Sequence, residues 1–136
     1  MRNDGKHDVD ATVKAESAVA WLGDAVAIKD PTAAHFGRHA GSNLLIVGPQ
    51  DQAALGMLSV ATVSLAASDP AAKFVVLDST RAGDASEGIW QQVTDALPHE
   101  STLTNASGTP AALNEIATEV ARRESESDET APPIYL

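Results

Sequence analysis

The sequence predicts an α/β fold, a parallel sheet with helices packed on both of its faces in three layers. Three observations support this fold class. Short aliphatic runs alternate with longer segments of helical character along most of the chain. Pro or Gly separates many of these segments, as expected where strands and helices end. The 136 residues suffice for one domain around a single hydrophobic core.

The N-terminal part of the chain has the weakest pattern. Residues 1–17 are polar and without periodicity, which predicts a flexible tail ahead of a domain spanning residues 18–136. Residues 18–29 predict two short extended pieces around a turn at Leu22-Gly23-Asp24. Asp30-Pro31 is expected to end this unit, and residues 35–42 to form a loop or one helical turn.

Two aliphatic runs predict buried strands that an apolar helix joins. Residues 43–48 hold four consecutive bulky aliphatics and end on Gly48, which is typical of a strand covered on both faces. Residues 50–67 predict a helix with apolar residues on nearly every side and Asp51 at its start. Residues 74–78 predict the second strand, which ends on Asp78.

The C-terminal half continues the alternation. Asp84 and Glu87 resemble a capping box for a helix that ends at Leu97. Residues 102–104 predict a short strand, and Thr109-Pro110 the start of an amphipathic helix. A charged linker is expected over residues 124–130. Residues 132–136 predict the beginning of a further strand, so the sheet is expected to be incomplete at the C-terminus.

The turn after the first buried strand is the candidate ligand site, because ligands of open parallel sheets bind beyond the carboxyl ends of strands. A working phosphate loop has Gly, four variable residues, Gly, Lys and then Ser or Thr. Here Gly48 keeps the first position, but Ala53, Ala54 and Leu55 replace the last three, so positive charge and metal ligand are missing. An ordinary strand–turn–helix corner is the alternative. The candidate cofactor-binding residues are Gly48, Pro49, Gln50, Asp51, Gln52, Ala53, Ala54 and Leu55, with Asp78 as a further candidate.

Several motifs occur in an order that points to one family. They are the strand 42–48 with its Gly, the strand 74–81 ending Leu-Asp-Ser-Thr-Arg, Leu97-Pro98-His99, the Arg122-Arg123 pair, and residues 132–136. Over residues 22–136 this order resembles the FtsK/SpoIIIE (HerA-FtsK) group of P-loop ATPases. The last motif is similar to the lead-in to a Walker B strand, whose acidic pair the sequence does not contain.

This resemblance implies a RecA-like P-loop NTPase fold, degenerate and truncated, in or derived from a DNA-translocating or secretion ATPase. ATP and Mg²⁺ are the cofactors that the family implies, yet the altered loop predicts no catalytic residues in this chain. Two alternatives stay open. One is an ATP-binding domain of the same type that needs a partner for activity. The other is a stand-alone α/β domain that binds proteins.

Composition narrows the classes of partner. A formal net charge of −10 with dispersed Lys and Arg does not favour direct binding of nucleic acid. The absence of cysteines, of a secretory leader and of a long apolar run predicts a cytoplasmic protein without a membrane segment. His35 and His39 lack a third ligand nearby, so no metal site is expected. An incomplete sheet would leave an open edge, which predicts self-association or membership of a larger ATPase assembly.

Overall fold

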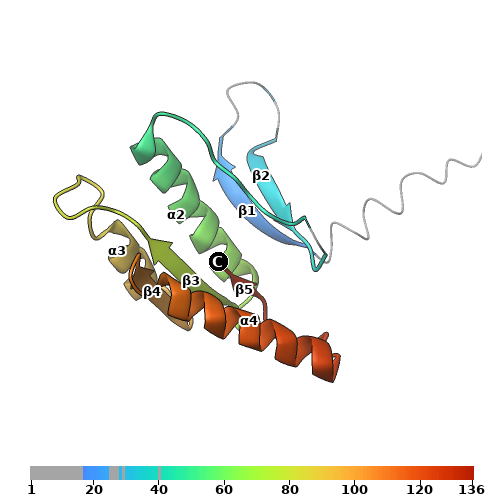
Figure 1. Cartoon of the computed structure of the whole chain (residues 1–136). Coiled ribbons are helices and arrows are strands. Elements are labelled where there is room, and N and C mark those ends of the chain that lie inside the picture. Colours follow the sequence, from blue (N-terminus) through green and yellow to red (C-terminus); the bar gives the residue numbers. More distant parts are fainter. Residues whose placement is uncertain (1–16, 25–27, 29, 40) are drawn as a thin grey trace, which may run out of the picture. The chain divides into compact units, whose positions relative to one another are not determined.

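A computed structural model describes residues 17–24, 28, 30–39 and 41–136 of the chain (Figure 1). The expected tail, residues 1–17, therefore lies almost wholly outside the described residues. The chain divides into two compact units, Met1–Ser68 and Asp69–Leu136, which are described separately below. No helix among the described residues is both long and apolar enough to cross a bilayer.

The first unit is a β-hairpin with a helix against it. Strands β1 (Ala18–Gly23) and β2 (Thr32–Phe36) pair antiparallel, with an irregular register between Trp21 and Gly23. Helix α2 (Asp51–Ser68) packs against β1. The hydroxyl of Ser64 accepts a hydrogen bond from the Trp21 N–H at 2.9 Å and so joins the helix to the strand.

The hairpin differs from the expected pattern on its second strand. That strand begins at Thr32, after Pro31, and includes His35, which was expected in a loop or helical turn. Pro31 lies outside the ladder, so its missing N–H costs no strand hydrogen bond. Because the run Thr-Ala-Ala-His-Phe has little bulky apolar content, its pairing with β1 is decided by the partner strand and not by its own pattern.

The prediction of a buried strand at residues 43–48 is wrong. Among the residues that the structure describes, the segment has no strand partner, and Leu45 and Val47 are each 85% exposed. Leu44 and Ile46 are half-buried, so exposure alternates along the segment as it would along a strand. Four aliphatics in a row indicate that a segment can form a strand, but a strand also requires a neighbour, which the local pattern cannot specify.

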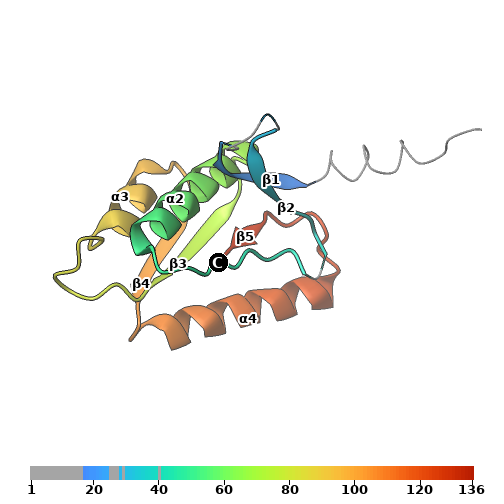
Figure 2. The same ribbon diagram turned by 90° about the horizontal axis from the view of Figure 1, so that it is seen from above.

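The second unit is a parallel three-stranded sheet in the order β4-β3-β5. Its strands are β3 (Lys73–Asp78), β4 (Ser101–Asn105) and β5 (Ile134–Tyr135). Helix α3 (Ile89–Ala96) connects β3 to β4, and α4 (Thr109–Glu126) connects β4 to β5. The two connections run in opposite directions across the sheet, so right-handed crossovers require the helices to lie on opposite faces. Figure 2 shows α3 and α4 on the two sides of the strands.

The core of this unit is small and centres on Phe74, which is 3% exposed. Its ring stacks on Tyr135 of β5 with centroids 5.5 Å apart, and meets His99 edge-on at 5.6 Å. The remaining buried apolar residues of the unit are alanines, namely Ala72, Ala112 and Ala131. One aromatic side chain thus joins the central strand to β5 and to the start of β4.

Two element boundaries in this unit differ from those expected. Helix α3 begins at Ile89 rather than near Asp84, because the Asp84 and Glu87 carboxylates accept hydrogen bonds from loop N–H groups (Arg81 N at 3.3 Å, Gly83 N at 2.6 Å). Those carboxylates therefore order the loop instead of capping a helix. Helix α4 continues to Glu126 and so includes the first three residues of the expected linker, 124–126. The strands at 74–78, 102–104 and 132–136 are confirmed as β3, β4 and β5.

Candidate functional site at the carboxyl ends of the parallel strands

The expected phosphate loop forms an open corner ahead of α2. The N–H of Ala54 donates to the carbonyl of Gln50 at 3.1 Å, so the helical hydrogen bonding begins there. Residues 48–53 are exposed, and only Ala54 and Leu55 are half-buried. A Cβ added at Gly48 would meet no atom within 4 Å. The glycine is therefore not required by a close backbone approach, and the corner does not curl into a cradle.

Charge at this corner opposes phosphate binding. The first turn of a helix carries free N–H groups and a partial positive charge, which favour anions. Asp51 lies in the first turn of α2 and adds a negative charge there. Residues 48–55 include no Lys or Arg to outweigh it. An incoming phosphate could therefore be bound only by the backbone N–H groups of the first turn of α2.

In the second unit, the carboxyl ends of the parallel strands form a better-defined candidate site than the corner at Gly48. Because the chain leaves β3 toward β4 on one side and returns to β5 on the other, β3 stands where the winding direction reverses. In open α/β sheets ligands enter the crevice at such a reversal, beyond the carboxyl ends of the strands. Asp78 ends β3 and Asn105 ends β4, and the two residues are register partners. The structure therefore brings Asp78 beside an amide that sequence analysis did not select.

Both side chains at this edge are engaged in local turns. The Asp78 Oδ1 accepts from the N–H of Thr80 at 2.9 Å. The Asn105 Oδ1 accepts from the N–H and the hydroxyl of Ser107, at 3.1 and 2.7 Å. These contacts are Asx turns, which hold the loops that follow each strand. Asp78 itself is half-buried at the end of β3.

Strand β5 covers only the beginning of β3. It pairs Ile134 with Lys73 and Tyr135 with Phe74, while β4 follows β3 as far as Asp78. On the β5 side, the last four residues of β3 therefore extend roughly 13 Å beyond the ladder at ~3.3 Å per residue. The carboxyl edge is open on that side within the second unit.

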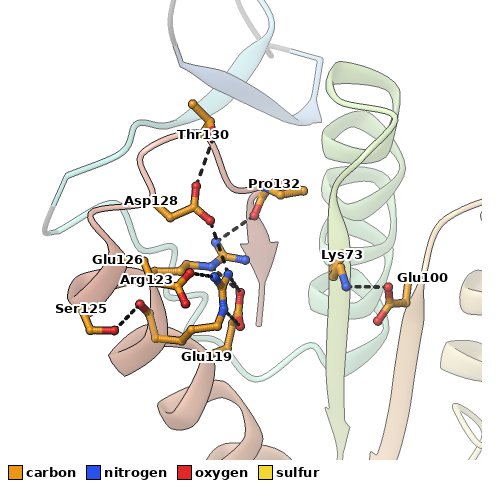
Figure 3. A network of polar contacts seen from close by, with 10 residues as sticks. Lys73, Glu100, Glu119, Arg123, Ser125, Glu126, Asp128, Thr130 and Pro132 are labelled. Atoms are coloured by element: carbon orange, nitrogen blue, oxygen red, sulfur yellow. Dashed lines mark hydrogen bonds and ion pairs between the residues drawn. The ribbon is translucent and has the colours of Figure 1, made fainter.

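The Arg122-Arg123 pair lies away from this edge, in a network of carboxylates on α4 (Figure 3). The guanidinium of Arg122 donates to Glu119 at 2.8 Å and also pairs with Glu126 and with Asp128. Arg123 donates from Nε to Glu119 at 2.7 Å. Both cations of the motif are thus matched by carboxylates of the same chain.

The network also fixes the path of the chain into β5. Arg123 Nη1 donates to the carbonyl of Pro132 at 2.9 Å, and Lys73 N donates to the carbonyl of Pro133 at 2.9 Å. Sequence analysis missed this role. The i, i+3 and i, i+4 spacing of Glu119 with the two arginines is a helical ion-pair pattern that could have revealed it.

The electrostatics of the network lower the pKa values of two of its carboxyl groups, those of Glu119 and Asp128. Hydrogen bonds from Arg122 and Arg123 lower the pKa of Glu119 from 4.5 to about 2. The hydrogen bond from Thr130, with a smaller contribution from Arg122, lowers the pKa of Asp128. Pairing with Glu119 raises the pKa of Arg122 further above its ordinary value. All three groups stay charged near neutral pH.

A cavity of about 260 Å³ lies between α4 and the sheet. Four of its charged lining residues are paired with one another, Lys73 with Glu100 at 2.6 Å and Arg123 with Glu119 at 2.7 Å, while Glu115 has no ion pair among the described residues. The volume falls below the ~300–1,000 Å³ of ordinary small-molecule sites. This cavity therefore offers little room and no unmatched cation for a nucleotide.

The histidines and Asp78 lie in separate surroundings. Among the described residues, no group of three or more His, Asp or Glu side chains could hold a metal ion. His35 lies in β2 with its Nδ1 3.5 Å from the Ser17 hydroxyl, and the Nδ1 of His39 is 3.4 Å from Ser42 Oγ. Within the described parts of the chain, the hydrogen bond to the Asp78 side chain comes from the backbone N–H of Thr80 and not from a nucleophilic side chain. No protein-family model matches the chain, and the comparisons with curated proteins and with solved structures give no match.

Proposed function

We propose that the chain is a non-catalytic module of FtsK/SpoIIIE-like P-loop architecture, in or derived from a DNA-translocating or secretion ATPase. It acts through contacts with proteins and not through nucleotide chemistry. The observation that carries this proposal is the set of residues at the start of α2. Ala53, Ala54 and Leu55 supply neither a cation nor a hydroxyl there, and Asp51 lies beside them. The parallel order of β4-β3-β5, with Asp78 at the end of its central strand, supports the fold part of the proposal.

The distribution of charge supports a protein partner over nucleic acid. The net charge is −10, and binding to a phosphate backbone depends on Lys and Arg that displace counterions. Arg122 and Arg123 already pair with Glu119, so a phosphate would have to compete with carboxylates held at 2.7–2.8 Å. In an assembly that moves DNA, other subunits would make the DNA contacts.

Titration of the whole chain with Mg-ATP in a calorimeter tests the proposal. We expect no saturable heat below millimolar nucleotide and no release of phosphate, since no residue of the loop neutralises the outer phosphates. Tight binding accompanied by hydrolysis would refute the proposal. Binding that appears only on adding a partner protein would instead favour the ATP-binding domain that a partner completes.

A stand-alone α/β interaction domain is the second candidate. The antiparallel hairpin β1-β2 and the unpaired segment 43–48 favour it, because neither belongs to the expected parallel order. In that case the corner at Gly48 never held phosphate, and rebuilding the missing residues there would not create affinity for nucleotide. Mg-ATP binding by a chain with those residues rebuilt therefore separates the two candidates.

A further inference from the structure

The cavity between α4 and the sheet lies near the beginning of the parallel strands. Val75 of β3 and Thr102 of β4, which are register partners, line it together with Ile134 of β5, which pairs with Lys73. The cavity is therefore at the opposite end of the strands from Asp78. All of its lining residues belong to the second unit.

Helix α4 lines this cavity largely with charged side chains. Glu115, Glu119 and Arg123 follow one another at spacings of four, which places them on one face of the helix, and all three line the cavity. Leu113 and Val120 of the same helix are 43% and 47% exposed. Charged side chains thus occupy a helix face that usually packs apolar residues on a sheet. Such a departure from the core pattern is typical of functional sites.

The charges around the cavity favour a cation. The lining contains three carboxylates and two cations, an excess of one negative charge. The ion pairs of Lys73 with Glu100 and of Arg123 with Glu119 account for four of these five groups, and Glu115 contributes the fifth. The net charge of −10 on the whole chain adds to the attraction for cations and to the repulsion of anions.

We propose that this cavity binds a small organic monocation, an ammonium group on a short aliphatic stem. The ammonium pairs with the carboxylate of Glu115, and the stem covers the half-buried side chains of Val75, Ile116 and Ile134. A volume of about 260 Å³ is small for a drug-sized ligand but is enough for a stem of a few carbons. The inference goes beyond the proposed function and does not rest on it, because neither ATP nor the corner at Gly48 is involved.

Titration of the whole chain with n-butylammonium chloride, followed by NMR of the backbone amides, tests the choice of ligand. We expect saturable shifts at lining residues such as Thr102, Ile116 and Ile134. Sodium pentanoate carries a carboxylate on the same butyl stem, and at the same ionic strength it should give no saturable shift. An equal response to both compounds would overturn the proposal, as would the absence of a saturable response to butylammonium.

A pair of charge-removing variants tests the site. Glu115→Gln should raise the Kd for butylammonium about fivefold, as expected for the loss of one solvent-accessible ion pair. Glu124→Gln is the matched control, because Glu124 is an exposed carboxylate of the same helix that does not line the cavity. It removes the same charge from the chain and should leave the Kd unchanged. Equal weakening in both variants would trace the binding to the general charge of the chain and overturn the proposal, as would an unchanged Kd for Glu115→Gln.

Discussion

Glu119 forms ion pairs with both Arg122 and Arg123. Through Arg122 it extends to Glu126 and Asp128, and through Arg123 to the carbonyl of Pro132, immediately before β5. These side chains are partly exposed, so the network is expected to add modestly to stability and mainly to fix the geometry of the α4–β5 connection.

Acidification should expose the role of Glu119. Its pKa in the folded chain is about 2, below the ordinary 4.5, so its stabilising effect is complete above pH ~4.5. The effect is lost as pH falls from about 4.5 toward 2, where the carboxylate takes up a proton. Urea unfolding followed across this range should therefore fall more steeply in free energy for the wild type than for Glu119→Gln.

Glu115→Gln serves as the matched control for this measurement. Glu115 is an exposed carboxylate one turn earlier on α4, and no ion pair involving it occurs within the described part of the chain. Its variant should keep the wild-type pH dependence. Equal pH slopes for all three proteins would show that the paired arginines do not act through Glu119.

Two glycines at helices differ in whether a side chain would fit at their position. Gly108 precedes α4, and a Cβ built on it would come 2.0 Å from Thr104 Oγ1 and 3.3 Å from Thr104 Cβ. Gly56 lies within α2, and a Cβ there would meet nothing within 4 Å. The same residue type is thus required for space at one element and is a weak point in another.

Alanine at these two positions should shift stability in opposite directions. Gly108→Ala forces Thr104 to move and is expected to destabilise the chain by about 1–3 kcal/mol. Gly56→Ala removes flexibility from the unfolded chain at an open helical site and should stabilise by about 0.5–1 kcal/mol. Thermal or chemical unfolding of the two variants measures both. A destabilising Gly56→Ala or a neutral Gly108→Ala would contradict the described environments.

Local sequence patterns predicted most of the helices and strands, but they did not predict which strands pair. The strands β3, β4 and β5 and the helices α2 and α4 follow from aliphatic runs, the Thr109-Pro110 start and amphipathic spacing, all of which act within one segment. The segment 43–48 carries the same signal as β3 but has no strand partner among the described residues, whereas the weaker run of β2 pairs with β1. Strand pairing depends on residues far away in sequence, which no local run encodes.

At the candidate site, too, the sequence predicted an element but not its strand pairing. The sequence predicted Asp78 at the end of a parallel strand, and the structure confirms that position. Its register partner Asn105 followed only from the three-dimensional pairing of β3 with β4. The phosphate corner was predicted with a strand before it, and the structure has only the helix that follows. The proposal that this corner is an emptied nucleotide site therefore rests on the residues at the start of α2.

Rebuilding those residues tests that central claim directly. The triple variant Ala53→Gly, Ala54→Lys and Leu55→Ser restores the small residue, the cation and the hydroxyl of a phosphate loop. A matched control carries Ala54→Met in place of Ala54→Lys, which keeps the length of the side chain without its charge. If the corner is an emptied nucleotide site, calorimetry should detect saturable Mg-ATP binding to the triple variant and none to the control or the wild type. Equal, negligible heats from all three proteins would contradict the account and leave the chain as an α/β interaction domain unrelated to nucleotide binding.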